Sequence, residues 1–73
     1  MMQNRTLQSG THIARINSSP MPDGLYEAQV FVRLTREPEV AETYIPVGLY
    51  PSEEEALRAA EERAERALRD HEF

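Results

Sequence analysis

Two alternating segments followed at once by an alanine-rich, charged segment constrain the fold of this 73-residue chain more than any other feature. Residues 25–34 and 40–50 each carry apolar side chains at every second position, which predicts two strands with one apolar face each. These positions are Tyr26, Ala28, Val30, Val32 and Leu34, then Ala41, Thr43, Ile45, Val47 and Leu49. We therefore expect an antiparallel hairpin with one face turned toward a core.

The length of the connecting loop predicts the register of this hairpin. A loop formed by residues 36–39 places Phe31 opposite Tyr44 and Arg33 opposite Glu42. An aromatic pair and a charge pair of this kind each stabilise a sheet by about 0.2–1 kcal/mol. A slip by one residue would turn one apolar face to solvent, so this register is favoured.

On the core side, the same register matches Leu34 with Ala41, Val32 with Thr43, Val30 with Ile45, Ala28 with Val47 and Tyr26 with Leu49. Pro46 interrupts the second strand and has no amide hydrogen to donate to a neighbour. The second strand is therefore expected at an edge of the sheet, or bulged near Gly48.

The segment 52–70 has the pattern of an amphipathic helix. Ser52, followed three positions later by Glu55, forms a capping-box sequence, and acidic residues 53–55 complement the positive end of the helix dipole. The apolar stripe consists mainly of small side chains, namely Ala56, Leu57, Ala60, Ala64, Ala67 and Leu68. Glu54, Arg58, Glu62, Arg66 and Asp70 form an opposite, alternating charge ladder expected to face solvent.

The amino-terminal part of the chain has a weaker pattern. Residues 1–19 are expected to form a flexible segment, in which Ile13 and Ile16 leave a short strand at 11–16 open. The domain proper is expected at 20–73. The predicted fold is α+β, with a hairpin or three-stranded antiparallel sheet packed on one face by a single carboxy-terminal helix (β-β-α or β-β-β-α).

Composition narrows the functional classes. The chain has no cysteine, which excludes disulfides and thiol chemistry and favours a reducing, cytoplasmic location. Its net charge of −5 disfavours general binding to nucleic acid or anionic membranes. All its basic residues are arginines, as in small bacterial proteins from GC-rich genomes. No spacing of His, Asp, Glu or Gly predicts a metal, cofactor or catalytic site, so we expect a non-enzymatic protein.

A sheet covered by one helix leaves its second face open. The residues expected there are Leu25, Phe31, Arg33, Tyr44 and Tyr50. Aromatic residues and arginine are enriched at interface hot spots, and so small a core often needs a partner. The sequence thus predicts an interaction or homodimerisation module that uses the open sheet face or a sheet edge. Ordinary partial exposure of a Phe31–Tyr44 pair is the alternative explanation.

The arrangement of residues 25–70 resembles, in architecture alone, the amino-terminal DNA-binding domains of integrases and the plant AP2-type domains, whose strands enter a groove. This resemblance implies a nucleic-acid-binding alternative. Arg15, Arg33, Arg36 and Tyr44 would then contact the nucleic acid. A further alternative is an antitoxin-like or phage accessory role, suggested by small size and acidity.

Overall fold

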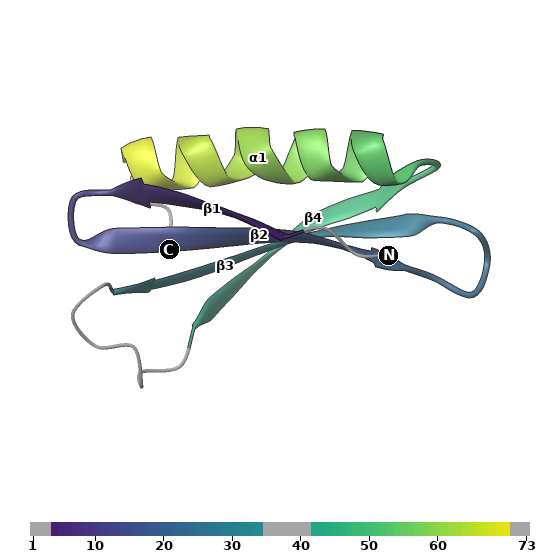
Figure 1. Cartoon of the computed structure of the whole chain (residues 1–73), viewed down its shortest axis with the longest axis horizontal. Helices are drawn as coiled ribbons and strands as arrows, with labels where there is room; N and C mark the ends of the chain where they lie inside the picture. Colours follow the sequence, from purple (N-terminus) through teal and green to yellow (C-terminus); the bar gives the residue numbers. More distant parts are fainter. Residues whose placement is uncertain (1–3, 35–41, 71–73) are drawn as a thin grey trace.

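The computed structural model describes residues 4–34 and 42–70, which form one four-stranded antiparallel sheet and one helix (Figure 1). The strands lie in chain order across the sheet: β1 Asn4–Ser9, β2 His12–Pro20, β3 Tyr26–Leu34 and β4 Thr43–Tyr50. Helix α1, Glu53–Asp70, follows β4 directly. The predicted α+β fold with one carboxy-terminal helix is confirmed, and the sheet has one more strand than we expected at most.

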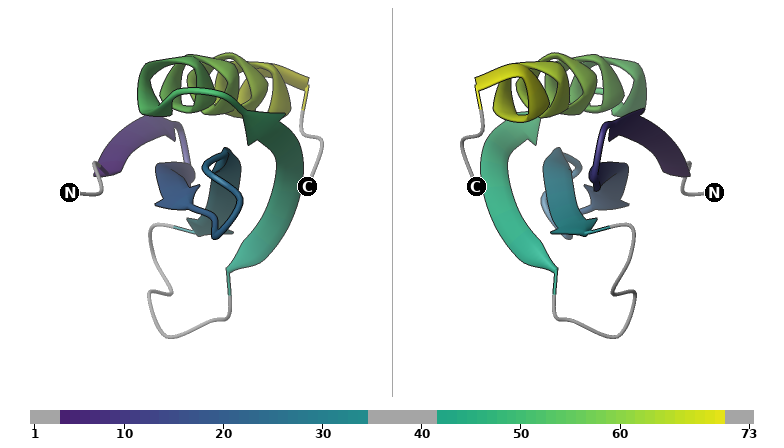
Figure 2. Two further views of the ribbon diagram at one scale, coloured as in Figure 1. Left: turned by 90° about the vertical axis from the view of Figure 1, so that its right-hand side faces the viewer. Right: turned by 90° about the vertical axis from the view of Figure 1, so that its left-hand side faces the viewer.

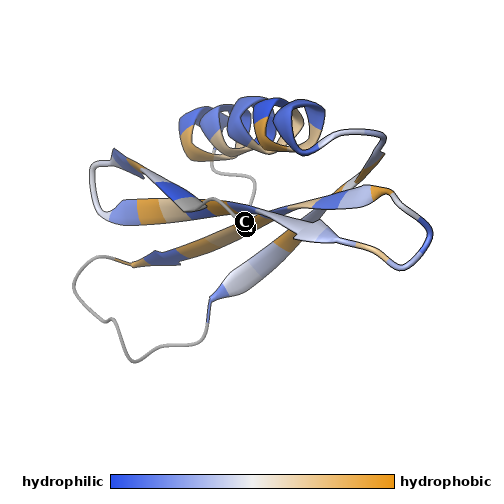
Figure 3. Cartoon of the chain, turned by 45° about the vertical axis from the view of Figure 1, so that its right-hand side comes forward, coloured by the Kyte–Doolittle hydropathy of each residue, from blue (hydrophilic) through white to orange (hydrophobic). Residues whose placement is uncertain are grey.

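Helix α1 covers one face of the sheet and leaves the other bare of helix (Figure 2). Figure 3 shows its hydrophobic residues turned toward the sheet and its hydrophilic residues turned away. The buried helix positions are the predicted ones: Ala56, Leu57, Ala60, Ala64, Ala67 and Leu68. They face a sheet core of Ala14, Ile16, Ala28, Val30, Val32 and Ile45. Because so many of these side chains are alanine or valine, helix and sheet can pack closely.

The amino-terminal strands are the largest difference from the sequence prediction. Within the segment 1–19, which we expected to be flexible, residues 4–9 form β1 and residues 12–19 form most of β2. Residues 12–16 of the short strand left open at 11–16 are part of the longer strand β2, and Thr11 lies in the preceding turn. A two-residue turn joins β1 to β2, and Gly10 in this turn adopts the positive φ of 59° that such turns require.

The predicted register of β3 and β4 is confirmed on one side of the bulge, from Val32 to Gln29 of β3. Phe31 pairs with Tyr44, as predicted, and the neighbouring core pairs Val32–Thr43 and Val30–Ile45 also form. Ala41, the predicted partner of Leu34, and the loop 36–39 lie outside the described residues.

The register changes at a bulge, which the sequence located correctly but whose consequence it missed. Gln29 pairs with Pro46, whereas the preceding residue Ala28 pairs with Gly48, so Val47 is an extra residue on β4. The predicted pairs Ala28–Val47 and Tyr26–Leu49 are therefore wrong. One extra residue reverses which face every later side chain occupies.

This reversal corrects the placement of the last two residues of β4. Tyr50 pairs with Tyr26 and packs against the core on the side of α1, although we expected it on the open face. Leu49 pairs with Glu27 on the open face and is 52% exposed, although we expected it in the core.

The start of α1 follows the predicted capping pattern. The Ser52 Oγ accepts a hydrogen bond from the Glu55 amide at 3.2 Å, and the Ser52 carbonyl accepts one from the Ala56 amide at 3.1 Å. Glu54 and Arg58, the first pair of the predicted charge ladder, form an ion pair at 3.0 Å. Within residues 4–34 and 42–70, no helix has the length and apolar character needed to cross a membrane.

Candidate functional site

The candidate site is the sheet surface that faces away from α1, hereafter the open face. Its central row crosses three adjacent strands, because Arg15 of β2 pairs with Phe31 of β3, which pairs in turn with Tyr44 of β4. Alternation along each strand turns these side chains away from the core residues on either side of them. No helix of the described part of the chain covers this row (Figure 2).

Arg15, Phe31 and Tyr44 form a stacked group, which we call the aromatic–arginine cluster. The Phe31 and Tyr44 ring centroids lie 5.2 Å apart at an interplanar angle of 35°, and the Arg15 guanidinium carbon lies 4.4 Å from the Phe31 centroid. Aromatic pairs of this geometry stabilise by about 0.5–1.5 kcal/mol, and exposed cation–π contacts by about 0.5–1 kcal/mol. The three side chains therefore stabilise one another across the sheet.

A carboxylate fixes the arginine of this cluster. Arg15 donates to Glu42 through Nη2 to Oε1 at 2.9 Å and through Nε to Oε2 at 3.4 Å. We expected Glu42 opposite Arg33, but the described pairing of β3 and β4 ends at Thr43, and Arg33 donates instead to the carbonyl of Leu34 at 3.4 Å. Two contacts from one guanidinium to one carboxylate set its orientation as well as its position.

A second carboxylate organises the other end of the open face. The Tyr44 hydroxyl donates to Glu27 Oε2 at 3.2 Å, and Gln29 Nε2 donates to Glu27 Oε1 at 2.9 Å. Asn17 Nδ2 in turn donates to Gln29 Oε1 at 2.9 Å, so the chain of hydrogen bonds spans β2, β3 and β4. Partial burial, followed by the negative charge of Glu27 and its hydrogen bond, raises the pKa of Tyr44 above its usual value.

The structure brings together three of the five residues predicted for an interaction surface. Phe31, Arg33 and Tyr44 lie on the open face. Leu25 precedes β3 in the turn, where its amide donates to Asp23 Oδ1 at 3.1 Å. Tyr50 lies on the side of α1.

The open face also has members that were not predicted as site residues. Glu27 belongs to this side of the sheet because it alternates with the core positions Tyr26 and Ala28, but its link to Tyr44 was not foreseen. Arg15 was predicted only as a nucleic-acid contact, because Ile13 and Ile16 lie three positions apart and do not define one apolar face of a strand. The remaining predicted nucleic-acid contact, Arg36, lies outside the described residues. Leu49 joins the open face only because of the bulge, which Pro46 and Gly48 signalled.

The open face presents groups suited to binding: aromatic rings, guanidinium groups, carboxylates and side-chain amides. Among the described residues, no three His, Asp or Glu side chains are grouped so that they could hold a metal ion. No protein-family model matches the sequence, and comparison with curated proteins and with solved structures found no match. The functional argument therefore depends on the geometry of the surface itself.

Proposed function

We propose that this protein is an interaction module that binds another polypeptide through its open face. The observation that supports the proposal best is the aromatic–arginine cluster at the centre of that face. Tyr44 is 43% exposed and Leu49 is 52% exposed, so a partner has apolar surface to bury on the same face that carries the guanidinium of Arg15. Tyrosine and arginine at the centre of a surface are typical of the residues that dominate binding energy.

The order of the cluster also favours binding. Each immobilised, rotamer-rich side chain costs about 0.5–1.5 kcal/mol when it is ordered only on association. Here Glu42 already holds Arg15, and Glu27 already holds Tyr44, before any partner arrives. A partner that contacts these side chains therefore gains affinity without the full cost of ordering them.

The same contacts weaken the nucleic-acid alternative. Two of its four predicted contact residues, Arg15 and Tyr44, are hydrogen-bonded to carboxylates. A carboxylate 2.9 Å from a guanidinium competes with phosphate for that guanidinium and repels phosphate nearby. Binding to nucleic acid at this face would require Glu42 and Glu27 to be displaced or neutralised.

Site-specific photo-crosslinking in living cells tests the proposal. We would place p-benzoyl-phenylalanine at Leu49 on the open face and, as the matched control, at the exposed Glu62 on α1. A discrete protein adduct is expected from position 49 and not from position 62. The change Phe31→Ser, made in the position-49 variant, should reduce that adduct while circular dichroism shows that the helix is retained.

The mass of the adduct identifies the kind of partner. An adduct of twice the 8.4 kDa of the chain would mean self-association through the open face, and any other discrete mass would mean a different protein. Equal adducts from positions 49 and 62, or an adduct unaffected by Phe31→Ser, would contradict the proposal. Retention on immobilised DNA that falls steeply with salt would favour the nucleic-acid alternative instead.

A further inference from the structure

The two edges of the sheet differ in their capacity to accept another strand. The edge formed by β4 carries Pro46, which cannot donate a hydrogen bond, and the bulge around Val47, both of which obstruct strand addition. The edge formed by β1 has neither feature, and its register with β2 is continuous over all six residues. β1 is therefore the edge open to pairing.

The hairpin turn determines which backbone groups of β1 face outward. In a two-residue hairpin the closing pair, here Ser9 with His12, exchanges both of its hydrogen bonds. Bonded and non-bonded pairs alternate from that point, so Thr6 and Gln8 direct their amide and carbonyl groups to the free edge. Six-residue β1 thus offers a short ladder of unpaired groups centred on Thr6.

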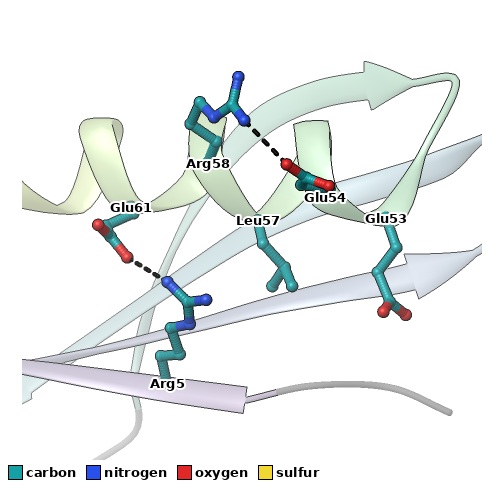
Figure 4. A pocket seen from close by; sticks show the side chains of 6 residues that line it. All are labelled: Arg5, Glu53, Glu54, Leu57, Arg58 and Glu61. Atoms are coloured by element: carbon teal, nitrogen blue, oxygen red, sulfur yellow. Dashed lines mark hydrogen bonds and ion pairs between the residues drawn. The ribbon is translucent and has the colours of Figure 1, made fainter.

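Helix α1 runs beside this edge in the same direction as β1 (Figure 1). Arg5 binds Glu61 at 2.7 Å, and Leu57 points toward β1 in the hollow between the two elements (Figure 4). Further along, Leu7 lines a second hollow together with Leu68. The bond between Arg5 and Glu61 therefore places the first half of β1, next to Thr6, beside the middle of the helix.

We propose that the β1 edge pairs with the β1 edge of a second copy of this chain. The two strands run antiparallel about a twofold axis at Thr6, which makes one continuous sheet of eight strands, four from each copy. In this register, Thr6 faces Thr6 of the second copy, and the outward groups on both strands coincide, as an antiparallel ladder requires. The same patch of each copy meets itself, which is the rule for twofold dimers.

The charges along α1 favour a second copy as the occupant. The helix positions that line the hollows beside β1 include Glu54, Arg58, Glu65 and Arg69. The twofold axis, which crosses α1 between Glu61 and Glu62, sets the two helices antiparallel, so that Arg58 faces Glu65 of the second copy and Glu54 faces its Arg69. Glu61, close to the axis, is already bound by Arg5 of its own chain. Each contact occurs twice by symmetry, and all four pair opposite charges. Arg58 and Glu54 bind each other at 3.0 Å within one copy, but their side chains are 65% and 82% exposed, so both can exchange this contact for one with the second copy.

The dimer would place two open faces side by side on one continuous sheet surface. This inference concerns the edge and does not depend on the proposed function of the open face. If both hold, two linked sites would bind a repeated or dimeric partner more tightly than one site does, because the second contact is intramolecular.

Light scattering coupled to size-exclusion chromatography, over a range of concentrations, measures the mass. We expect twice the 8.4 kDa of the chain at high concentration. Thr6→Pro removes an outward amide without removing a bond to β2, and should leave a folded monomer. Arg58→Glu should weaken the dimer about tenfold, and the swap Arg58→Glu with Glu65→Arg should restore it. Arg66→Glu is the matched control, with the same charge change away from β1, and should leave the dimer unchanged.

Three results would overturn the proposal. The first is a monomer at every concentration. The second is a dimer that Arg58→Glu and Arg66→Glu weaken equally, since this would reflect net charge alone. The third is a dimer that survives Thr6→Pro but is lost in Phe31→Ser, since this would place self-association on the open face. The charge swap keeps the test decisive if Thr6→Pro fails to fold.

Discussion

Ser18 is a buried polar residue whose removal should stabilise the protein. It lies in β2 opposite Ala28, on the side of α1, and is fully buried. Its hydroxyl has no hydrogen-bond partner. A buried, unsatisfied polar group costs about 1–3 kcal/mol in folding free energy, because the group leaves water without replacing the hydrogen bonds it made there. Ser18→Ala removes that cost.

Two smaller effects oppose the gain. The missing oxygen leaves a void of roughly 10–15 Å³, which at about 24 cal/mol per Å³ costs about 0.3 kcal/mol. Alanine is also a weaker strand former than most residues, at a cost of a few tenths of a kcal/mol. We therefore expect Ser18→Ala to raise the free energy of unfolding by about 0.5–2 kcal/mol.

Urea and thermal unfolding at one fixed protein concentration measure this change. A gain of 1 kcal/mol should raise the Tm by about 4–8 °C for a domain of this size. Ser19→Ala is the matched control, because Ser19 belongs to the same strand, has the same β-propensity change and points to the other face. It should stay within about ±0.5 kcal/mol of the parent. If Ser18→Ala instead lowers stability by more than about 1 kcal/mol, the hydroxyl is satisfied in solution and the reasoning is refuted.

Three further predictions concern the helix contacts and the open face. Ser52→Ala removes the helix cap and should lower the free energy of unfolding by about 0.5–2 kcal/mol in urea titrations. Ala60→Leu overfills the helix–sheet contact and should cost about 1–3 kcal/mol, whereas Ala59→Leu, at a partly exposed position, should cost less. In a spectrophotometric pH titration, the raised pKa of Tyr44 should appear as a phenolate absorbance that develops at a higher pH than usual. Tyr44→Phe should remove this absorbance. Glu27→Gln should return the pKa only partway to its usual value, since burial is the larger cause. Because the folded state holds this proton more strongly, its contribution to stability is present below about pH 10 and is lost as the pH rises through the raised pKa.

The sequence predicted those helices and strands whose apolar residues recur at a regular spacing. Alternation identified β3 and β4, and the spacing of alanines identified the buried face of α1, because each of these elements has one continuous apolar side. β1 could not be found in this way. Leu7 alone in that strand packs against the core, so the strand forms because β2 is beside it and not because of its own pattern.

Long-range contacts account for what sequence reasoning missed on the open face. The bond between Arg15 and Glu42 joins residues on different strands that are 27 positions apart, and it exists only because β2 pairs with β3. The exchange of Leu49 and Tyr50 had a local signal in Pro46 and Gly48. That signal predicted either an edge strand or a bulge, but not the number of residues a bulge would insert, and this number decides the faces.

The difference between the two sheet edges determines what kind of assembly the protein can form. A sheet with two accepting edges could add copies without limit and form a fibre. Here the bulge and Pro46 obstruct β4, while β1 remains open. Pairing of β1 with itself uses up the open edge of both copies, and the outer edges of the resulting sheet are both β4. Association through β1 therefore stops at two copies. The bulge that brings Leu49 to the open face thus also limits growth of the sheet.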